Sequence, residues 1–500
     1  MMKMKRTGLL ISVLILTFST LAAQNVDDAL RYSQIFYNGT ARFNSMGGAF
    51  TALGGDISSL GQNPAGIGVF RSSEFSISPQ LINFRADTRF SGNNASDYIY
   101  DFTLGQAGVI MNLRNNNTTT GLVTLNFGYS YSRTNSLSES IRISGTSSSS
   151  SLLDLWAEKI DGLVDTTLYK YYDIADAYLG WYTYLLDTLS GTNDRYGTVY
   201  SDYGSFPSVY GQTMLRLINN NGYTGEHSIA LGGNFSNKLY FGLSLGIINV
   251  EYENKYEHIE STDEILPSEF KDFNYALYYK NTGTGYSLKF GGIYVPVEQL
   301  RIGFSFHSPT LFRISEYVYD NLYTHINGIE DSKSNDPMWY KYSLTTPFRA
   351  TVGGAFQLKK LGVISAEYEF ADYAMARFST VGEDDYDYTQ KNDAIKQSLS
   401  SVNNFRVGAE GRIGRFYLRG GYGYYGKTYQ TGELNENTSH NSFSLGAGFR
   451  EQNLFVDFGF TTISNPQKYI LYSTLTDTPV ANMDINRKIF TVSFGYKFGY

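Results

Sequence analysis

The sequence predicts an all-β fold, a 14-stranded antiparallel transmembrane β-barrel with an N-terminal plug (hatch) and a partly helical extracellular loop insertion. Three observations lead to this prediction. Segments of strand character recur from Glu74 to the C-terminus, and the gaps between them alternate between long and short. The composition combines 43 Tyr, 33 Phe and 50 Gly with no apolar run beyond the leader that is long enough for a membrane-spanning helix.

The first element, residues 1–23, has the pattern of a cleaved secretory signal peptide. Basic residues open the chain, Leu9 to Phe18 is apolar, and small residues end the segment at Ala23. The apolar stretch is too short to span a bilayer stably as a helix. We therefore expect the mature chain to begin near Gln24.

Residues 24–73 form the second element, the predicted plug. Its stretch from Phe43 to Gly68 is too rich in Gly and Ala for an ordinary strand. The Asn63-Pro64 step makes a turn, because Pro fixes its own φ and keeps the preceding residue out of the helical region. The neighbouring glycines allow backbone to pack tightly against backbone. Taken alone, the stretch could equally be a Gly-rich linker.

The third element, residues 74–500, is the predicted barrel. Its last strand alternates strictly, with aromatic and apolar residues on one face and polar residues and glycines on the other. The residues of the apolar face are Phe490, Val492, Phe494, Tyr496, Phe498 and Tyr500. The same alternation occurs in earlier segments, such as Leu239 to Ile247. A soluble two-sheet sandwich could also alternate in this way.

The gaps between segments distinguish a barrel from a sandwich. The long gaps are residues 85–104, 134–225, 257–279, 319–340, 379–401, 429–440 and 466–485, and the short gaps are 115–120, 236–238, 296–299, 359–360, 412–414 and 450–453. Outer-membrane barrels have long extracellular loops, short periplasmic turns and an even strand number, so both chain ends lie on the periplasmic side. Because the side chains of 14 strands need not fill such a pore, we expect residues 24–73 to enter from the periplasmic side and obstruct it.

The largest gap, residues 134–225, is predicted to be an extracellular insertion with two amphipathic helices. Apolar residues recur at helical spacing from Leu152 to Leu168 and again from Ile174 to Leu189. These helices could pack on each other and on the barrel rim, or they could offer an apolar surface for ligand capture. Trp156 and Trp181 are the candidate capture residues, because two of only three Trp residues lie here.

Composition and charge exclude several functions. A net charge of −7 and a pI near 5.4 argue against a nucleic-acid partner. The absence of Cys excludes disulfides, thiol nucleophiles and Cys-ligated metals. The five His residues show no metal-ligand spacing, and no phosphate-binding loop or GxSxG motif occurs. We therefore expect no metal, no cofactor and no linear catalytic motif.

Charged and polar residues on the lumen side of the predicted strands are the remaining candidates for a site. A hydrated wall with mutually paired charges would explain most of them, although one cation could instead bind a carboxylate head group. The candidates are Arg301, His307, Arg406, Glu410 and Arg419, with Glu367, Glu369, Asp457 and Lys497 assigned to the same face.

The plug stretch resembles the N-terminal plug of the FadL-type outer-membrane transporters of long-chain fatty acids and aromatic hydrocarbons. The residues that carry the resemblance are Gly47, Gly48, Ala49, Asp56, Asn63, Pro64, Ala65 and Gly66, which occur in the family's order and at compatible spacing. The last strand similarly resembles the C-terminal strand that the barrel-assembly machinery recognises. The resemblance covers about thirty residues of the plug and more weakly two strand segments, 303–308 and 405–424.

This resemblance implies a monomer in the outer membrane of a Gram-negative bacterium, in contact with outer-membrane lipids. It also implies passive uptake of hydrophobic small molecules: capture at extracellular loops, passage through the lumen, and release by plug rearrangement and a lateral opening. A receptor for a bulkier ligand such as haem, a general porin, and an outer-membrane lipase remain alternatives. A lipase site assembled from Ser, His and Asp on different strands would leave no linear motif.

Overall fold

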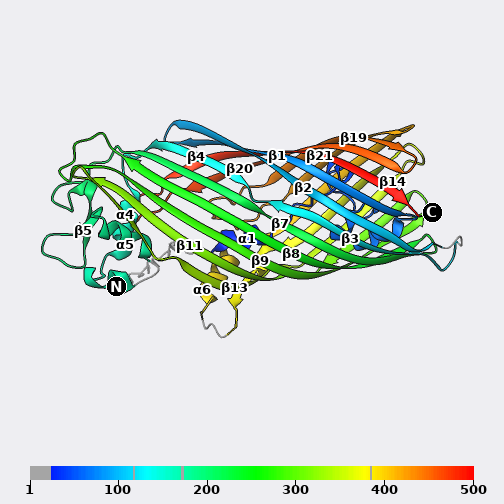
Figure 1. Cartoon of the computed structure of the whole chain (residues 1–500), viewed down its shortest axis with the longest axis horizontal. Coiled ribbons are helices and arrows are strands. Elements are labelled where there is room, and N and C mark those ends of the chain that lie inside the picture. Colours follow the sequence, from blue (N-terminus) through cyan, green and yellow to red (C-terminus); the bar gives the residue numbers. More distant parts are fainter. Residues whose placement is uncertain (1–23, 116–118, 171–173, 383–385, 500) are drawn as a thin grey trace, which may run out of the picture.

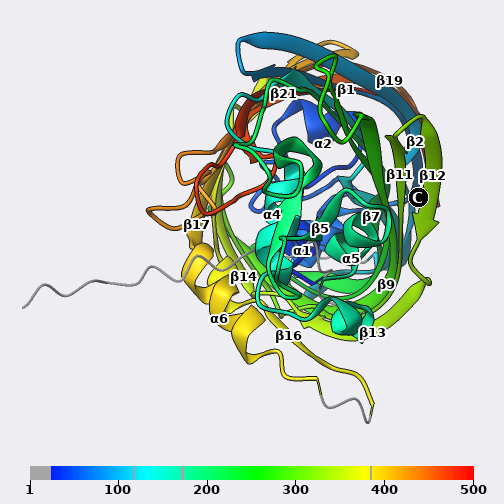
Figure 2. The same ribbon diagram turned by 90° about the vertical axis from the view of Figure 1, so that its left-hand side faces the viewer.

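The protein is a closed antiparallel barrel of 14 wall strands, as predicted. The computed structural model describes residues 24–499 apart from 116–118, 171–173 and 383–385, so the predicted signal peptide and Tyr500 lie outside the described residues. The barrel closes where β1 pairs with β21. Figure 1 shows it from the side, and Figure 2 shows the ring of strands from the long-loop end.

Most wall strands are continuous. They are β1 (Ser73–Phe90), β2 (Asn93–Asn115), β3 (Leu122–Ser136), β7 (Thr213–Phe235), β8 (Leu239–Ser261), β9 (Phe270–Val297), β17 (Ser401–Ile413), β18 (Phe416–Tyr425), β19 (His440–Glu451), β20 (Leu454–Ile470) and β21 (Val480–Phe498). The three strands between β9 and β17 are each interrupted. Their parts are β10 (Leu300–His307) with β11 (Leu311–Ile326), β13 (Met338–Thr345) with β14 (Arg349–Gln357), and β15 (Gly362–Asp372) with β16 (Arg377–Thr380).

The interruptions have identifiable causes in the sequence. Pro309 separates β10 from β11, and Pro347 separates β13 from β14, because Pro has no N–H to donate to a sheet ladder. A short 3₁₀ turn, η5 (Tyr373–Met375), interrupts the third strand. The sequence pattern predicts continuous strands across both prolines, so this part of the prediction is wrong. Pro309 and Pro347 are the residues from which these interruptions could have been predicted.

Side chains alternate between the two faces of the wall, as period two requires. On β8 the outward residues change from Leu243 and Leu245 to Glu251 and Glu253 along the strand. On β1 they change in the same direction, from Leu81 to charged residues beyond Asn83. An apolar band therefore encircles the end of the barrel that has short turns, and the strands extend beyond it at the other end.

Residues 24–72 lie inside the ring of strands (Figure 2) and are called the luminal segment below. It contains α1 (Val26–Ser33), α2 (Ala41–Ser45), α3 (Ser59–Gln62) and the 3₁₀ helix η1 (Pro64–Val69). Its start lies beyond the apolar band, because Tyr32 contacts Asn281 and Tyr388 donates to Gln24. The segment then runs toward the short-turn end, where β1 begins. Its first described residues are therefore not at the short-turn, or periplasmic, end where we expected them.

The insertion at the long-loop end is shorter than the predicted 134–225. β4 (Glu139–Thr146) continues the wall beyond β3 and pairs with the first residues of β7, which leaves residues 147–212 for the insertion. Its elements are α4 (Leu152–Ile160), η2 (Asp165–Lys170), α5 (Ala175–Tyr182), a hairpin of β5 (Leu186–Thr188) and β6 (Tyr196–Thr198), and η4 (Val199–Ser201). Both helices are shorter than predicted, since Gly162 at φ 88° follows α4 and Tyr184 at φ 61° follows α5.

Two further elements extend from the wall. β12 (Ile329–Ser334) forms a hairpin with β11, and α6 (Thr389–Ser398) lies beside β16 on the outside of the ring (Figures 1 and 2). Asn392 of α6 bonds both backbone groups of Phe378, which has no wall strand on that side. Among the described residues, no helix has the length and apolar character needed to cross a membrane.

Candidate functional site in the barrel lumen

The plug motif builds a set of tight turns in the luminal segment. Gly47 and Gly48 have φ values of 64° and 73°, a left-handed conformation that favours glycine. Asp56 accepts one hydrogen bond from the Thr40 hydroxyl, which lies 3.0 and 2.8 Å from its two carboxylate oxygens, and another from the Ser58 amide. Asn63 accepts from the Ala65 amide at 3.0 Å and so caps η1.

The remaining motif residues allow close contact between the luminal segment and the wall. Pro64 opens η1, where its missing N–H has no helical partner to lose. Ala65 is fully buried, and the Ala49 carbonyl accepts from the Ser365 hydroxyl at 2.6 Å. Gly66 lies against Gly54 and Ser59 within the segment, so a side chain there would clash. The motif is therefore a compact fold that fits against the strands around it.

Glycines of the wall make room for this fold. A Cβ atom added to any of them would meet atoms of the luminal segment at or below van der Waals distance. The set is Gly108, Gly128, Gly232, Gly242, Gly291, Gly303, Gly353, Gly408, Gly421, Gly446 and Gly459, which lie on different wall strands. We call this set the glycine belt. It explains part of the high glycine content, because a thin wall lets the segment's backbone approach the strands.

The predicted lumen residues hold the luminal segment. Arg301 donates to the Leu53 carbonyl at 2.8 Å, and His307 donates through Nε2 to the Gln62 carbonyl at 2.7 Å. Glu410 accepts two hydrogen bonds from the Arg42 guanidinium of the segment, at 2.9 and 3.1 Å. Arg419 in turn donates to Glu410 at 2.6 Å. These groups therefore contact the segment instead of facing an open channel.

Arg406 organises a second buried network. It donates to Glu367 at 2.5 Å and to Glu369 at 2.9 Å, and all three side chains are at most 1% exposed. Glu367 also accepts from the Thr51 amide and from the Gln62 side chain. The network links wall and segment, so removal of one charge would leave others buried without compensation.

A cavity lies between the luminal segment and strands β1, β3 and β18–β21, and we call it the aromatic cavity. The space inside it is about 70 Å³, which is room for several water-sized groups. Phe36, Tyr37 and Tyr425 line it together with two arginines, Arg133 and Arg487. The lining contains no carboxylate.

The two arginines of the aromatic cavity keep part of their hydrogen-bonding capacity free. Arg133 donates to Asp101 at 2.6 Å, and Arg487 donates to Glu139 at 2.5 Å. The Nε atoms of both guanidinium groups are buried without a hydrogen-bond partner among the described residues. Both arginines were missed in the sequence analysis. At these points of β3 and β21, bulges and strand ends decide which side chains face the lumen, and alternation alone does not show them.

The β2–β3 backbone ladder ends beside this cavity. The last pair is Gln106 and Ser132, and β3 then bends at a register shift between Arg133 and Asn135. Beyond this point β3 and β4 pair only with β7 among the described strands, and the end of the β1–β2 hairpin packs on β4 through side chains: Thr88 donates to the Arg142 carbonyl at 2.6 Å, and Ser140 donates to Asp97 at 2.8 Å. The residues that bend away, 133–136, line the aromatic cavity.

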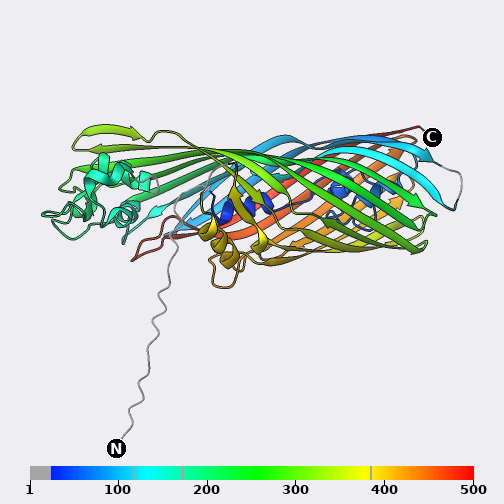
Figure 3. The ribbon, with the colours of Figure 1, turned by 90° about the horizontal axis from the view of Figure 1, so that it is seen from below.

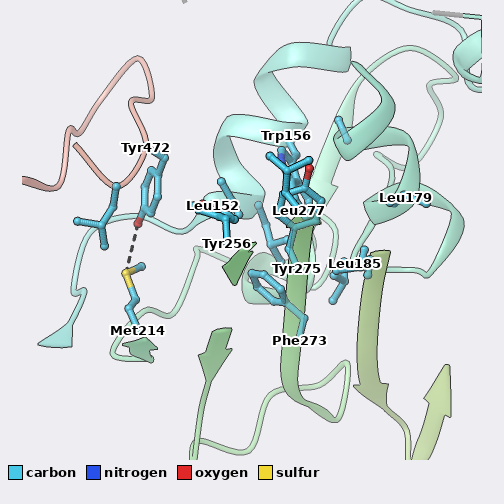
Figure 4. Close-up of a cluster of buried hydrophobic side chains, with 14 of the residues drawn as sticks. Leu152, Trp156, Leu179, Leu185, Met214, Tyr256, Phe273, Tyr275, Leu277 and Tyr472 are labelled. Atoms are coloured by element: carbon cyan, nitrogen blue, oxygen red, sulfur yellow. Dashed lines mark hydrogen bonds between the residues drawn. The ribbon is translucent and has the colours of Figure 1, made fainter. Parts of the chain in front are cut away.

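The insertion closes the long-loop end with an apolar core (Figure 4). Trp156 is fully buried and packs against Phe273 and Tyr275 of β9, with ring centroids 6.0 and 5.2 Å apart. Trp181 is partly exposed and stacks on Tyr178. Of the two predicted capture residues, the structure therefore places Trp156 in the core and Trp181 near the surface.

One buried polar contact attaches the insertion to the wall. Glu260 of β8 accepts from the Ser151 hydroxyl at 2.6 Å, the Leu152 amide at 2.8 Å and the Tyr200 hydroxyl at 3.0 Å. The carboxylate also contacts His258 at 2.9 Å and is fully buried. Over residues 24–499 with their gaps, no group of three or more acidic or His side chains is arranged to hold a metal.

Comparison with known proteins places the fold. No family model and no curated protein matches the chain. Among solved structures, the Pseudomonas putida toluene transporter TodX is similar at a TM-score of 0.54 and 12% identity, covering 93% of this chain and 100% of TodX. A Pseudomonas aeruginosa FadL homologue is similar at a TM-score of 0.54 and 11% identity, covering 92% of this chain and 99% of its own. This chain therefore has the fold of the FadL-type transporters.

Proposed function

We propose that this protein is an outer-membrane transporter that takes up hydrophobic compounds passively through a plugged barrel. The observation that carries the proposal is the aromatic cavity, which lies between the luminal segment and the point where the β2–β3 ladder ends. A molecule in that cavity has one aromatic wall, and separation of the β1–β2 hairpin from β4 would give it a lateral exit. The names of the similar structures, a toluene transporter and a FadL homologue, support the same function.

In this proposal the luminal segment is the plug. The glycine belt, the hydrogen bonds donated by Arg301 and His307, and those that Glu410 accepts from Arg42 keep residues 39–72 in place. Residues 24–38 make none of the glycine-belt contacts; Ala29, Leu30 and Tyr32 pack on apolar wall residues, and Phe36 and Tyr37 line the aromatic cavity. Transport then requires movement of this first part only. The chain carries no ATPase motif, so the compound moves down its gradient.

The cargo is a hydrophobic molecule, either a long-chain fatty acid or an aromatic hydrocarbon. The free Nε atoms of Arg133 and Arg487 favour a molecule with a carboxylate, because a charge-assisted hydrogen bond would orient its head. The protein would be a monomer in the outer membrane of a Gram-negative bacterium. It would be exported through the signal at residues 1–23 and inserted by the barrel-assembly machinery.

Uptake by reconstituted vesicles tests the proposal. Protein in liposomes should accelerate entry of oleate or toluene over empty liposomes, and Arg133→Gln with Arg487→Gln should slow oleate more than toluene. Equal entry with and without protein would refute transport. Steady conductance in planar bilayers would indicate a porin, a shifted absorption band on haem titration would indicate a haem receptor, and ester turnover would indicate a lipase.

A further inference from the structure

A second cavity adjoins the aromatic cavity, and Thr134 of β3 lines both. It has a space of about 30 Å³ between residues 32–35 of the segment and strands β3 and β7 to β14. Three hydroxyl groups line it without a hydrogen-bond partner among the described residues: those of Ser33, Thr224 and Ser287. These residues are only 3%, 5% and 5% exposed. We call it the hydroxyl cavity.

Unpartnered hydroxyls in three different elements require an explanation, since buried polar groups are nearly always hydrogen-bonded. The cavity has room for about two or three water-sized groups. The three oxygens come from α1, β7 and β9. Each hydroxyl can both donate and accept. The geometry therefore selects a ligand with several hydrogen-bonding atoms.

The charged groups in the same cavity are already occupied. Lys289 is paired with Glu226 and donates to the Gly61 carbonyl at 2.8 Å. Arg349 donates to Glu369 at 3.1 Å, to the Tyr373 hydroxyl and to the Ser33 carbonyl. Among the described residues, Lys289 and Arg349 have no buried nitrogen without a partner, whereas Arg133 and Arg487 of the aromatic cavity each have an unpartnered Nε. A neutral, hydroxylated head group fits this environment better than an acid.

The wall beside the hydroxyl cavity has a weak seam. The register on both sides of the interruptions places Pro309 opposite Pro347, and neither has an N–H to donate. The next pair along the ladder is bonded again, since the Thr346 amide donates to the Thr310 carbonyl at 3.0 Å and the Thr346 hydroxyl accepts from the Thr310 amide at 2.9 Å. Ser308, Thr310, Thr346 and Pro347 all line the cavity.

An aromatic strip runs along the outside of the same seam. Ring centroids of Phe290 and Phe306 are 5.3 Å apart, those of Phe306 and Phe348 are 5.7 Å apart, and those of Phe348 and Phe370 are 6.2 Å apart. These side chains point outward. Phe290 lies in β9, Phe306 in β10 and Phe370 in β15, and Phe348 is the residue before β14. An acyl chain could lie along this strip while its head group enters the seam.

We propose that the hydroxyl cavity is a second binding site, which takes the neutral polyhydroxyl head group of a single-chain lipid of the monoacylglycerol type. The head enters through the seam between Pro309 and Pro347, and the chain remains on the outer aromatic strip. The site adjoins the aromatic cavity at Thr134, and the proposal concerns binding only. It holds whether or not the protein transports this lipid.

The test measures binding of 1-monooleoylglycerol to purified, delipidated full-length protein by native mass spectrometry. It should bind at least about tenfold more tightly than methyl oleate, which has the same chain and no hydroxyl, because at least two hydrogen bonds are lost. Thr224→Val and Ser287→Ala should each weaken binding roughly 2- to 10-fold. Ser244→Ala is the matched control, since its hydroxyl is equally buried and unpartnered but lies outside the cavity.

Equal binding of the ester and the glyceride, or no response to the cavity variants, would mean that water alone occupies the site and would overturn the proposal. The seam is tested with Thr310→Cys and Thr346→Cys in one chain, which has no other cysteine. Oxidation should slow association of monooleoylglycerol, and reduction of the same sample should restore it. An unchanged association rate after complete oxidation would exclude this seam as the entrance.

Discussion

The luminal segment and the insertion of residues 147–212 both fill the barrel, but different contacts hold them. The luminal segment is held by hydrogen bonds from wall side chains, by backbone contact with the glycine belt and by several small apolar clusters along its length. The insertion is held by an apolar core around Trp156 and by one buried carboxylate, Glu260. Figure 3 shows the two regions along the barrel axis, the insertion at one end and the luminal segment within the strands.

The difference indicates how each region can move. A hydrogen bond or ion pair loses much of its stabilising free energy when one partner moves slightly, because a buried polar group without a partner costs free energy. Apolar contacts are less directional, so a core can shift as a unit while it remains buried. The luminal segment is therefore expected to stay in register on the wall beyond residue 38, whereas the insertion can tilt on its attachment at Glu260.

The largest expected effect tests the polar contacts that hold the luminal segment. Arg406→Ala removes the cation that Glu367 and Glu369 share, and it should lower the free energy of unfolding by about 3–5 kcal/mol. Urea unfolding in detergent measures this. Arg415→Ala is the control, because its ion pair with Glu451 is exposed and should contribute less than about 1 kcal/mol. Similar losses for both variants would show that the network does not hold the segment.

A second variant tests the apolar core that holds the insertion. Trp156→Ala should cost about 3–5 kcal/mol within the insertion, because it leaves a large cavity in a closed core. Limited proteolysis should then cut residues 147–212 much faster, while urea unfolding of the barrel changes little. Tyr182→Ala, an exposed residue of the same insertion, is the control. Loss of barrel stability in the Trp156 variant would mean that the insertion and wall form one cooperative unit.

The glycine belt gives a third, smaller effect. Gly421→Val places a side chain against Met46 and Gly47 and should cost about 1–3 kcal/mol. The displaced segment should also raise single-channel conductance in planar bilayers. Gly420→Val is matched to it, because Gly420 is the adjacent residue and has no atom closer than 3.8 Å to an added Cβ. Equal conductance for the two variants would contradict the close-contact role of the belt.

The smallest effect is a pH dependence of the insertion. Burial raises the pKa of the Asp154 carboxyl, at the start of α4, to about 6. The folded insertion therefore favours the protonated acid, and stability should rise as pH falls from 7 through 6 and level off below the unfolded pKa of about 4. Thermal melting followed by Trp fluorescence at pH 7 and pH 5 measures this. Asp154→Asn should remove most of the difference, and an unchanged difference would assign the pH dependence to another group.

Much of the architecture could be predicted from the sequence. Alternation with period two identified the wall strands, including β21, and the order of long and short gaps identified a barrel with 14 strands. The prediction was poorer near prolines and at strand ends. Pro309 and Pro347 interrupt strands that alternation alone makes continuous, and β4 and the start of β7 extend the wall into residues expected to be loop.

The candidate site was predicted only in part. Alternation placed Arg301, His307, Arg406, Glu410 and Arg419 on the inner face, and the structure has them there. Their partners could not be predicted, because each lies far away in the sequence: Glu410 contacts Arg42, and Arg301 contacts Leu53. Arg133 and Arg487 were missed, and so were the three hydroxyls of the hydroxyl cavity.

The sequence by itself determined the class of fold, because alternation and loop length are local properties that each strand records independently. It also identified the Gly-Ala-Asn-Pro stretch, because tight turns need specific residues. Only the tertiary structure decided which groups meet inside the barrel. Closure of the sheet brings residues hundreds of positions apart to the same level of the lumen, where space left between the luminal segment and the wall defines both cavities.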